Sequence, residues 1–330
     1  MPLLQEFASG SATFDIAIIA ATISILLGGI LFGVGLGFGM RRIRLLGAEE
    51  IGQGIVSAAM VGALFAFASL LDSTTASLVP SSAVPSCTAI QNPSSSPFSF
   101  YSCHLYALSS SHSQLASSLS RSADIAGFVS SLRVDAGVVL AQPFFAAEEA
   151  SRSLSEASRS ASQSSALAFF ELEIANLVRA SALLVFLPAG LLLRTFFATR
   201  KLGAAAMALA IAVYVVYPLL FLYTFAASKS LAASEEALAA ASQFNSEFAS
   251  IPLLDLDATG AVRDKINEMS SGDFGGKLQP LFPLSSRAIS LSNADLVLFP
   301  LLSLAITAVA ALELYAFLSA PIFLPYFDSI

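Results

Sequence analysis

The chain has 330 residues, of which 56% are hydrophobic and only 12% are charged, and its mean hydropathy is +0.77. Soluble proteins carry roughly 25% charged residues, so this composition excludes an ordinary soluble domain and predicts a polytopic membrane protein. The net charge of −7 excludes binding of nucleic acid through a basic exterior, although a pore for nucleic acid needs only a polar lining.

The first apolar run, residues 16–40, is long enough to cross a bilayer, for which about 20 residues suffice. Three arginines follow this run at positions 41, 42 and 44, and no lysine or arginine precedes it. Positive charge resists translocation, so the N-terminus is predicted to lie outside the cell. Small residues recur along the run and would let another helix approach closely, so we expect helix packing at Gly29, Gly33, Gly35, Gly37 and Gly39.

A second apolar run, residues 51–71, completes a first transmembrane hairpin over residues 1–71. We expect Glu49 and Glu50 to be the solvated start of the second helix of this hairpin. Residues 72–165 then form an outer segment that is rich in serine and alanine and contains an amphipathic helix. Within it, residues 127–147 are apolar but interrupted by polar residues. They are expected to lie on a surface, with a membrane crossing left open.

The chain has two cysteines, Cys87 and Cys103, and both fall in this outer segment. A pair of cysteines outside the cell predicts a disulfide that staples a proline- and serine-rich loop. A metal site with the nearby His104 and His112, or two free thiols, remain alternatives, although the spacing fits no compact ligand pattern.

Residues 166–227 form the central transmembrane hairpin, and its connection carries three basic residues, Arg194, Arg200 and Lys201, which predict a cytoplasmic loop. At the outer end, three polar residues follow at i, i+3 and i+6 on one helix face: Glu173, Asn176 and Arg179. Such a stripe is either a surface ion pair or part of a polar conduit, because ionisable residues in membranes normally face an interior. Pro188 is expected to kink the inner part of the helix.

A second outer segment covers residues 228–293, where Ser234 resembles the N-cap of an alanine-rich helix that ends near Phe248. The last span, residues 296–318, belongs to a final segment, 294–330, whose short tail lies inside. This span contains Glu313, the deepest acid in the chain, for which Arg194 or Arg200 is the best partner on depth. A transport role for Glu313, such as proton coupling, is the alternative.

No metal, nucleotide or hydrolase motif occurs in the sequence, so we expect neither an enzyme nor a bound cofactor. The predicted fold is all-α, a polytopic helical membrane protein with about five transmembrane helices and two extracytoplasmic helical segments. It would lie in the plasma membrane with the N-terminus outside and the C-terminus in the cytoplasm, in contact with lipid.

The block from Leu187 to Phe196, followed by Thr199 to Gly203 and by Tyr217-Pro218, resembles one found in archaeal polytopic membrane proteins. Among these proteins, it resembles the CedA family, the membrane subunits of the crenarchaeal Ced-type DNA-import system. Those subunits are in turn similar to the polytopic inner-membrane pore component of bacterial conjugation machines.

The resemblance implies a channel-type subunit of a DNA-translocation assembly, working as an oligomer with a cytoplasmic ATPase and other membrane subunits. Two other functions remain open from the sequence. One is a structural subunit that anchors a pilus or secretion complex and conducts nothing. The other is a transporter of small solutes or ions that uses Glu313 and Arg179.

Overall fold

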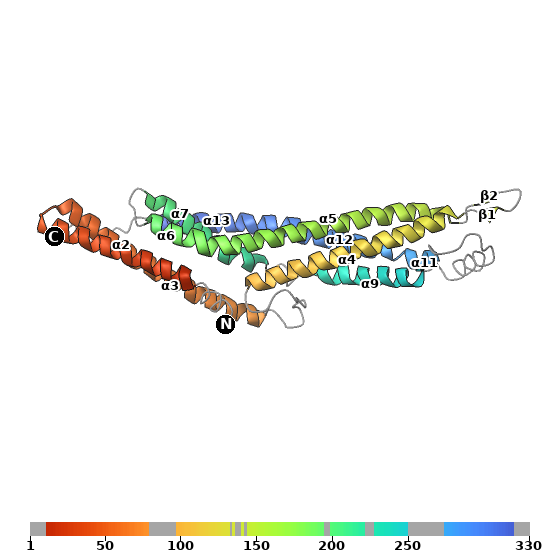
Figure 1. Ribbon diagram of the computed structural model, residues 1–330, viewed down its shortest axis with the longest axis horizontal. Coiled ribbons are helices and arrows are strands. Elements are labelled where there is room, and N and C mark those ends of the chain that lie inside the picture. Colours follow the sequence, from red (N-terminus) through yellow and green to blue (C-terminus); the bar gives the residue numbers. More distant parts are fainter. Residues whose placement is uncertain are drawn as a thin grey trace. The chain divides into compact units, whose positions relative to one another are not determined.

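The computed structural model describes residues 11–78, 97–132, 134–135, 140–141, 144–194, 199–221, 228–249 and 274–319 (Figure 1). The predicted all-helical class is confirmed, because these residues are helical apart from short connections and a two-residue antiparallel strand pair. Within the described residues, two helices are long and apolar enough to cross a membrane, Arg200–Phe221 and Phe274–Ser319, and Thr22–Gly37 is a shorter apolar helix. A count of five spans remains a prediction.

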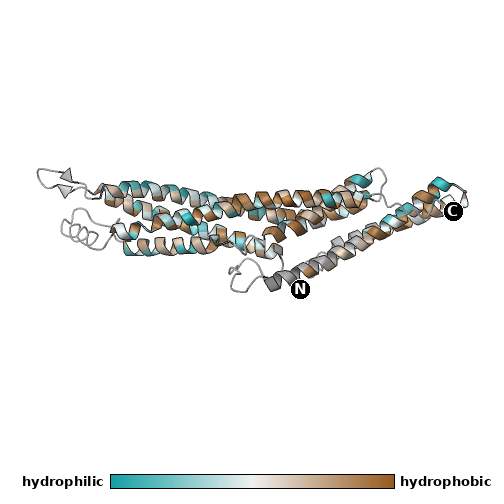
Figure 2. Ribbon diagram, turned by 180° about the vertical axis from the view of Figure 1, so that it is seen from behind, coloured by the Kyte–Doolittle hydropathy of each residue, from teal (hydrophilic) through white to brown (hydrophobic). Residues whose placement is uncertain are grey.

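The chain forms two compact units, which are described separately. The first unit consists of Met1–Cys103, Glu173–Ala226 and Pro300–Ile330, and the second of His104–Leu172 and Ala227–Phe299. Hydrophobic colour gathers on α2, α6, α7 and α13, whereas the helices of the second unit mix hydrophilic and hydrophobic residues along their length (Figure 2). The hydrophobic residues of the chain are therefore concentrated in the helices of the first unit.

In the first unit, α2 (Ser11–Gly37) and α3 (Arg41–Leu78) form a tight antiparallel hairpin. Gly39 has a φ of +67°, a conformation that glycine adopts without steric cost, and it allows the sharp reversal before Arg41. Because α3 already begins at Arg41, the basic cluster and the Glu49–Glu50 pair stand on a continuous helix. The prediction that these acids are the solvated start of a later helix is wrong.

The central hairpin of the first unit consists of α6 (Leu187–Arg194) and α7 (Arg200–Ile211). A small apolar core of Leu191, Ala204, Met207 and Ala208 joins the two helices to Leu318 of α13 (Phe299–Ser319). Farther along the hairpin, Phe98 of α4 (Pro97–Ser131) stacks on Tyr214 with ring centroids 5.9 Å apart.

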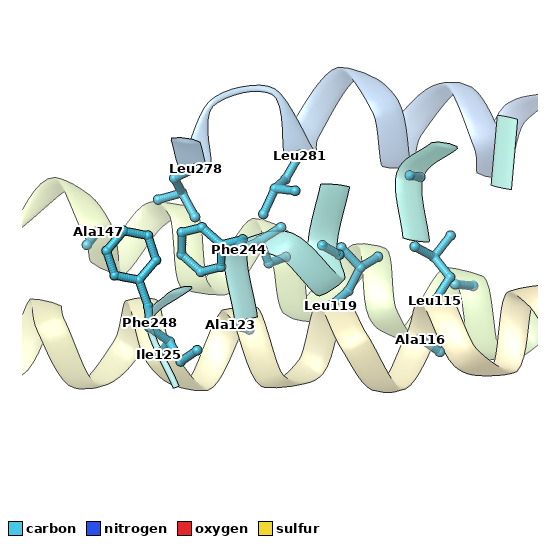
Figure 3. Close-up of a cluster of buried hydrophobic side chains, with 14 of the residues drawn as sticks. Leu115, Ala116, Leu119, Ala123, Ile125, Ala147, Phe244, Phe248, Leu278 and Leu281 are labelled. Carbon is cyan, nitrogen blue, oxygen red and sulfur yellow. The ribbon is translucent and has the colours of Figure 1, made fainter. Parts of the chain in front are cut away.

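The second unit is a helical bundle built from parts of α4 and α5 (Ala146–Ser181), with α9 (Ser230–Glu247), α11 (Phe274–Leu278) and α12 (Leu281–Asn293). Leu115, Leu119 and Ile125 of α4 are buried in one hydrophobic cluster with Phe244 of α9 and with Phe248, which directly follows that helix (Figure 3). The apolar spacing that predicts an amphipathic helix thus corresponds to the buried face of α4.

Residues 127–147 do not form one helix. They include the end of α4, the paired strands β1 (Val134–Asp135) and β2 (Leu140–Ala141), and the first residues of α5. Strands of two residues and a helix end cannot supply the roughly 20 helical residues that a crossing requires. The described part of this segment is therefore not a single crossing helix, and its place on a surface remains a prediction.

The start of α9 differs from the prediction. The helix begins at Ser230, and Ser234, the predicted cap, is buried one turn inside it and bonds to Ser111 of α4 over 2.7 Å. The backbone N–H of Ser230 donates instead to the hydroxyl of Ser228 over 3.1 Å. The N-cap position itself is held by Lys229, whose side chain makes no capping bond, and Ser228 stands one residue before it.

Candidate functional site

The central hairpin brings its two helices close together because glycines face each other across it. A Cβ added to Gly203 would lie 2.6 Å from both the amide nitrogen of Arg194 and the carbonyl oxygen of Gly190. A Cβ on Gly190 would lie 2.7 Å from Cγ of Met207. The absence of these side chains fixes the separation of the helices, and it positions Arg194 and Arg200 at the end of the hairpin.

Both arginines contact polar side chains of α3, and we call these five residues the inner cluster: Arg194, Arg200, Glu49, Glu50 and Gln53. Arg200 donates from Nη1 to Glu49 over 2.5 Å and from Nη2 to Glu50 over 2.8 Å, so its guanidinium bridges two adjacent carboxylates. Arg194 Nε lies 3.4 Å from Oε1 of Gln53. The inner cluster ties the first helical hairpin to the second.

Burial sets the electrostatics of the inner cluster. Arg194, Glu50 and Gln53 are 4%, 7% and 4% exposed. Burial raises the pKa of the Glu50 carboxyl, and the adjacent Arg200 opposes that shift. Burial, and then the positive charge of Arg200, lower the pKa of Arg194. Two arginines and two glutamates balance in charge, which suits a closed structural junction.

The predicted pairing of Glu313 with Arg194 or Arg200 is wrong. Arg200 is engaged by Glu49 and Glu50, and Glu313 is exposed on α13 without an ion-pair partner among the side chains that the structure describes. The position of residues along the apolar runs correctly indicates that an acid pairs at the basic end of the hairpin. It names the wrong acid, because the sequence places Glu49 and Glu50 at the start of a helix, whereas α3 is continuous through them.

On α13, the face that carries Glu313 is otherwise apolar. Leu302, Ile306, Val309 and Phe317 share its helical spacing and are between 41% and 75% exposed. One flank of the helix is buried at Ser303, Thr307 and Leu318. One carboxylate thus interrupts a long exposed apolar stripe, which we call the Glu313 stripe.

The outer stripe of α5 is not brought together with the inner cluster. Glu173 and Asn176 are exposed, and the side chain of Arg179 lies outside the described part of the chain. Lys201, the third of the predicted basic residues, is the second residue of α7 and is exposed next to the half-buried Arg200. A conduit lined by the outer stripe remains a prediction.

The predicted packing glycines fall into different environments. Gly35 lies against the backbone of α3, where an added Cβ would be 2.4 Å from the amide nitrogen of Arg44, and Gly39 makes the turn. Gly29, Gly33 and Gly37 have no atom within 4 Å of an added Cβ among the described residues. The contact between α2 and α3 uses Gly28, Gly35, Gly47 and Gly54.

Beside its hydrophobic cluster, the second unit buries several polar side chains, most of them serines. His112 and Ser292 are both fully buried and lie 2.5 Å apart between Nε2 and Oγ. Asn245 accepts from Ser122 and donates to the Ser118 carbonyl, each over 2.8 Å. Burial lowers the pKa of His112, and likewise of His104, to about 4, so both imidazoles are neutral near neutral pH.

The residues of the predicted disulfide are only partly described. Cys103 is completely buried in α4, and the described part of the chain has no free cysteine. Cys87 lies outside the described residues, so its pairing with Cys103 remains a prediction. No group of three or more metal-ligating side chains occurs among the residues that the structure describes.

The comparisons with known proteins do not assign this chain to a family. No family model matches the sequence. No curated protein matches it. No solved structure matches the fold.

Proposed function

We propose that this chain is an integral membrane, channel-type subunit of a macromolecular translocation assembly, with DNA as the transported substrate. The single observation that supports it most is the Glu313 stripe, an exposed apolar helix face that one carboxylate interrupts toward its C-terminal end. An apolar face of this length suits lipid, whereas a carboxylate at membrane depth is costly unless it meets another polar group or a water-filled space.

Assembly with other chains would remove the conflict between an apolar face that suits lipid and a carboxylate that is costly in lipid. If copies of the chain or other membrane subunits cover the stripe, Glu313 faces a protein interior, where a polar conduit can form. A cytoplasmic ATPase would drive transport, and the exposed Lys201 beside the inner cluster is a contact point for it. The choice of DNA comes from the sequence resemblance around Leu187 to Gly203 and Tyr217-Pro218.

A non-conducting anchor subunit is the second candidate, and the inner cluster favours it. Its charges are balanced and its arginines are engaged by α3, as in a static junction. An anchor needs a stable junction but no path for a substrate.

Reconstitution in liposomes tests the proposal. Liposomes with the wild-type protein should let ions cross their membrane, as an enclosed ion-sensitive dye reports, and should let labelled single-stranded DNA cross it. Glu313→Gln should change that permeation, while Glu235→Gln, an exposed acid of α9, should not. Stable incorporation without any permeation, with the partner ATPase present, would overturn the channel and leave the anchor.

A further inference from the structure

In the part of the chain that the structure describes, three helices contain the same local break. A π-helical turn covers Ala182–Phe186 (η3), Ala212–Val216 (η5) and Ala294–Leu298 (η7). In each one the residue after the turn donates its N–H to the first carbonyl of the turn, five residues back: Leu187 to Ala182, Tyr217 to Ala212 and Phe299 to Ala294. The next residue is always proline.

The sequence repeats with the structure. The three segments read ALLVFLP, AVYVVYP and ADLVLFP, which share alanine at the first position, valine at the fourth and proline at the seventh. The prolines that they end on are Pro188, Pro218 and Pro300. A proline inside a helix has no N–H for the preceding turn and clashes with it, and a widened turn accommodates both effects.

The position of a proline decides whether such a turn forms. Among the described residues, the other prolines stand at helix starts: Pro97 opens α4, Pro280 precedes α12 and Pro283 is its third residue. At these positions the missing N–H costs nothing, because the first N–H groups of a helix have no partner within it. No π-turn occurs at any of these three places.

Two of the π-turns, η3 and η5, contact each other across the central hairpin. η3 lies 8 to 12 residues before Arg194, which corresponds to about 12–18 Å along the helix. With a hydrocarbon core of roughly 30 Å, that distance places the paired turns near the centre of the bilayer. This depth rests on the proposed membrane placement, whereas the helix geometry does not.

We infer that the paired π-turns η3 and η5 are a conformational switch point of the central hairpin. A π-turn holds one residue more than an α-helical turn. When that residue is taken up into regular α-helix or passed along the chain, the part of the helix beyond it turns by about 100°. In α5 the part that turns carries Glu173 and Asn176, while the inner cluster holds Arg194 in place. The switch would turn the outer stripe toward or away from its neighbours.

Hydrogen exchange of the full-length protein in detergent tests this inference. Amides in 182–187 and 212–217 should exchange at least about tenfold faster than those in the flanking helical turns, because the widened turns open locally. Pro188→Leu should slow exchange in 182–187 by restoring the missing N–H. The matched control Pro283→Leu should leave exchange around α12 unchanged. Turn amides as protected as their neighbours in the wild type would overturn the inference.

A distance measurement gives a second test. Asn176 and Lys201 are both exposed and lie on either side of η3 in the chain, so each can be replaced by a spin-labelled cysteine. The wild type should show two distances or one broad distribution, and deletion of Val185 from the turn should leave a single narrow one. The same narrow distribution in both proteins would contradict a switch. If the deletion variant fails to fold, hydrogen exchange of the turn amides in the wild type still tests the switch.

Discussion

At the scale of single residues, Arg200 matters most, because one guanidinium holds two carboxylates of α3. Its side chain is 15% exposed and that of Glu50 is 10% exposed, so this pair is shielded from solvent and salt. Removal of one partner leaves the other buried without compensation, which costs more than the pair itself contributes. The inner cluster is therefore a structural requirement whichever function the protein has.

We predict that Arg200→Ala lowers the free energy of unfolding by about 3 kcal/mol, because Glu50 is left as an uncompensated buried charge. Lys201→Ala is the matched control, since this neighbouring cation is exposed, and it should change stability by less than about 0.5 kcal/mol. Denaturant titration in detergent measures both. The additional change Glu50→Gln should recover part of the loss. Equal effects of the two alanine variants would contradict the role of the cluster.

The buried histidines of α4 predict an acid-sensitive second unit. The folded-state pKa of His112 is about 4, below its ordinary 6.5, so the unfolded chain binds the additional proton between these values. The stabilisation is fully present above pH 6.5 and is lost as the pH falls toward 4. The slope is about 1.4 kcal/mol per pH unit for each histidine.

Unfolding measured between pH 7 and pH 4 checks this prediction. The slope should fall by about half in His112→Gln, because His104 contributes the other half. A variant with the same pH slope as the wild type would show that His112 is accessible to protons in the folded state.

At the scale of elements, the contact between α2 and α3 depends on which glycines face it. A Cβ on Gly47 would lie 2.4 Å from the amide nitrogen of Phe32, whereas a Cβ on Gly33 meets no described atom within 4 Å. Glycine to alanine normally stabilises a helix by up to about 1 kcal/mol. The two positions should therefore respond with opposite sign.

We predict that Gly47→Ala lowers the thermal unfolding midpoint in detergent, since the helices must move apart. Gly33→Ala should leave that midpoint unchanged or raise it. A loss of stability in Gly33→Ala comparable to that in Gly47→Ala would contradict the packing described for this hairpin.

Helix positions could be predicted well from apolar runs, but their contacts could not. The runs 16–40 and 51–71 correspond to α2 and to the middle of α3. Glu49 and Glu50 look solvated in sequence because charge precedes an apolar run, and only the tertiary fold shows that Arg200 meets them. The serine bonds of the second unit, such as Ser111 to Ser234, carry no sequence signal. The three similar segments that end in Pro188, Pro218 and Pro300, by contrast, are a sequence signal from which the π-turns could have been predicted.

At the scale of the whole molecule, the Glu313 stripe predicts self-association or association with other subunits. Phe317 lies four residues beyond Glu313 on the same face, while Leu304 lies nine residues before it and about 180° around the helix. Both are exposed, at 75% and 59%. They form a matched pair of positions for cross-linking.

We expect Phe317→Cys, in a background without native cysteines, to form cross-linked dimers in membranes under oxidation. Leu304→Cys should not, because its face is purely apolar and suits lipid. Equal cross-linking at both positions would indicate random collision, and none at either would remove the support for an assembled subunit.

Cysteine labelling can show whether the chain is a membrane protein with its second unit outside the cell, as the proposed function requires. In a cysteine-free background, one cysteine is placed at Gln163 of α5 and another, in a separate variant, at Lys201; both positions are exposed. An impermeant thiol reagent applied to intact cells should label Gln163→Cys and should reach Lys201→Cys only after lysis. Labelling of Lys201→Cys but not Gln163→Cys in intact cells would show the opposite orientation and exclude a membrane subunit with its second unit outside.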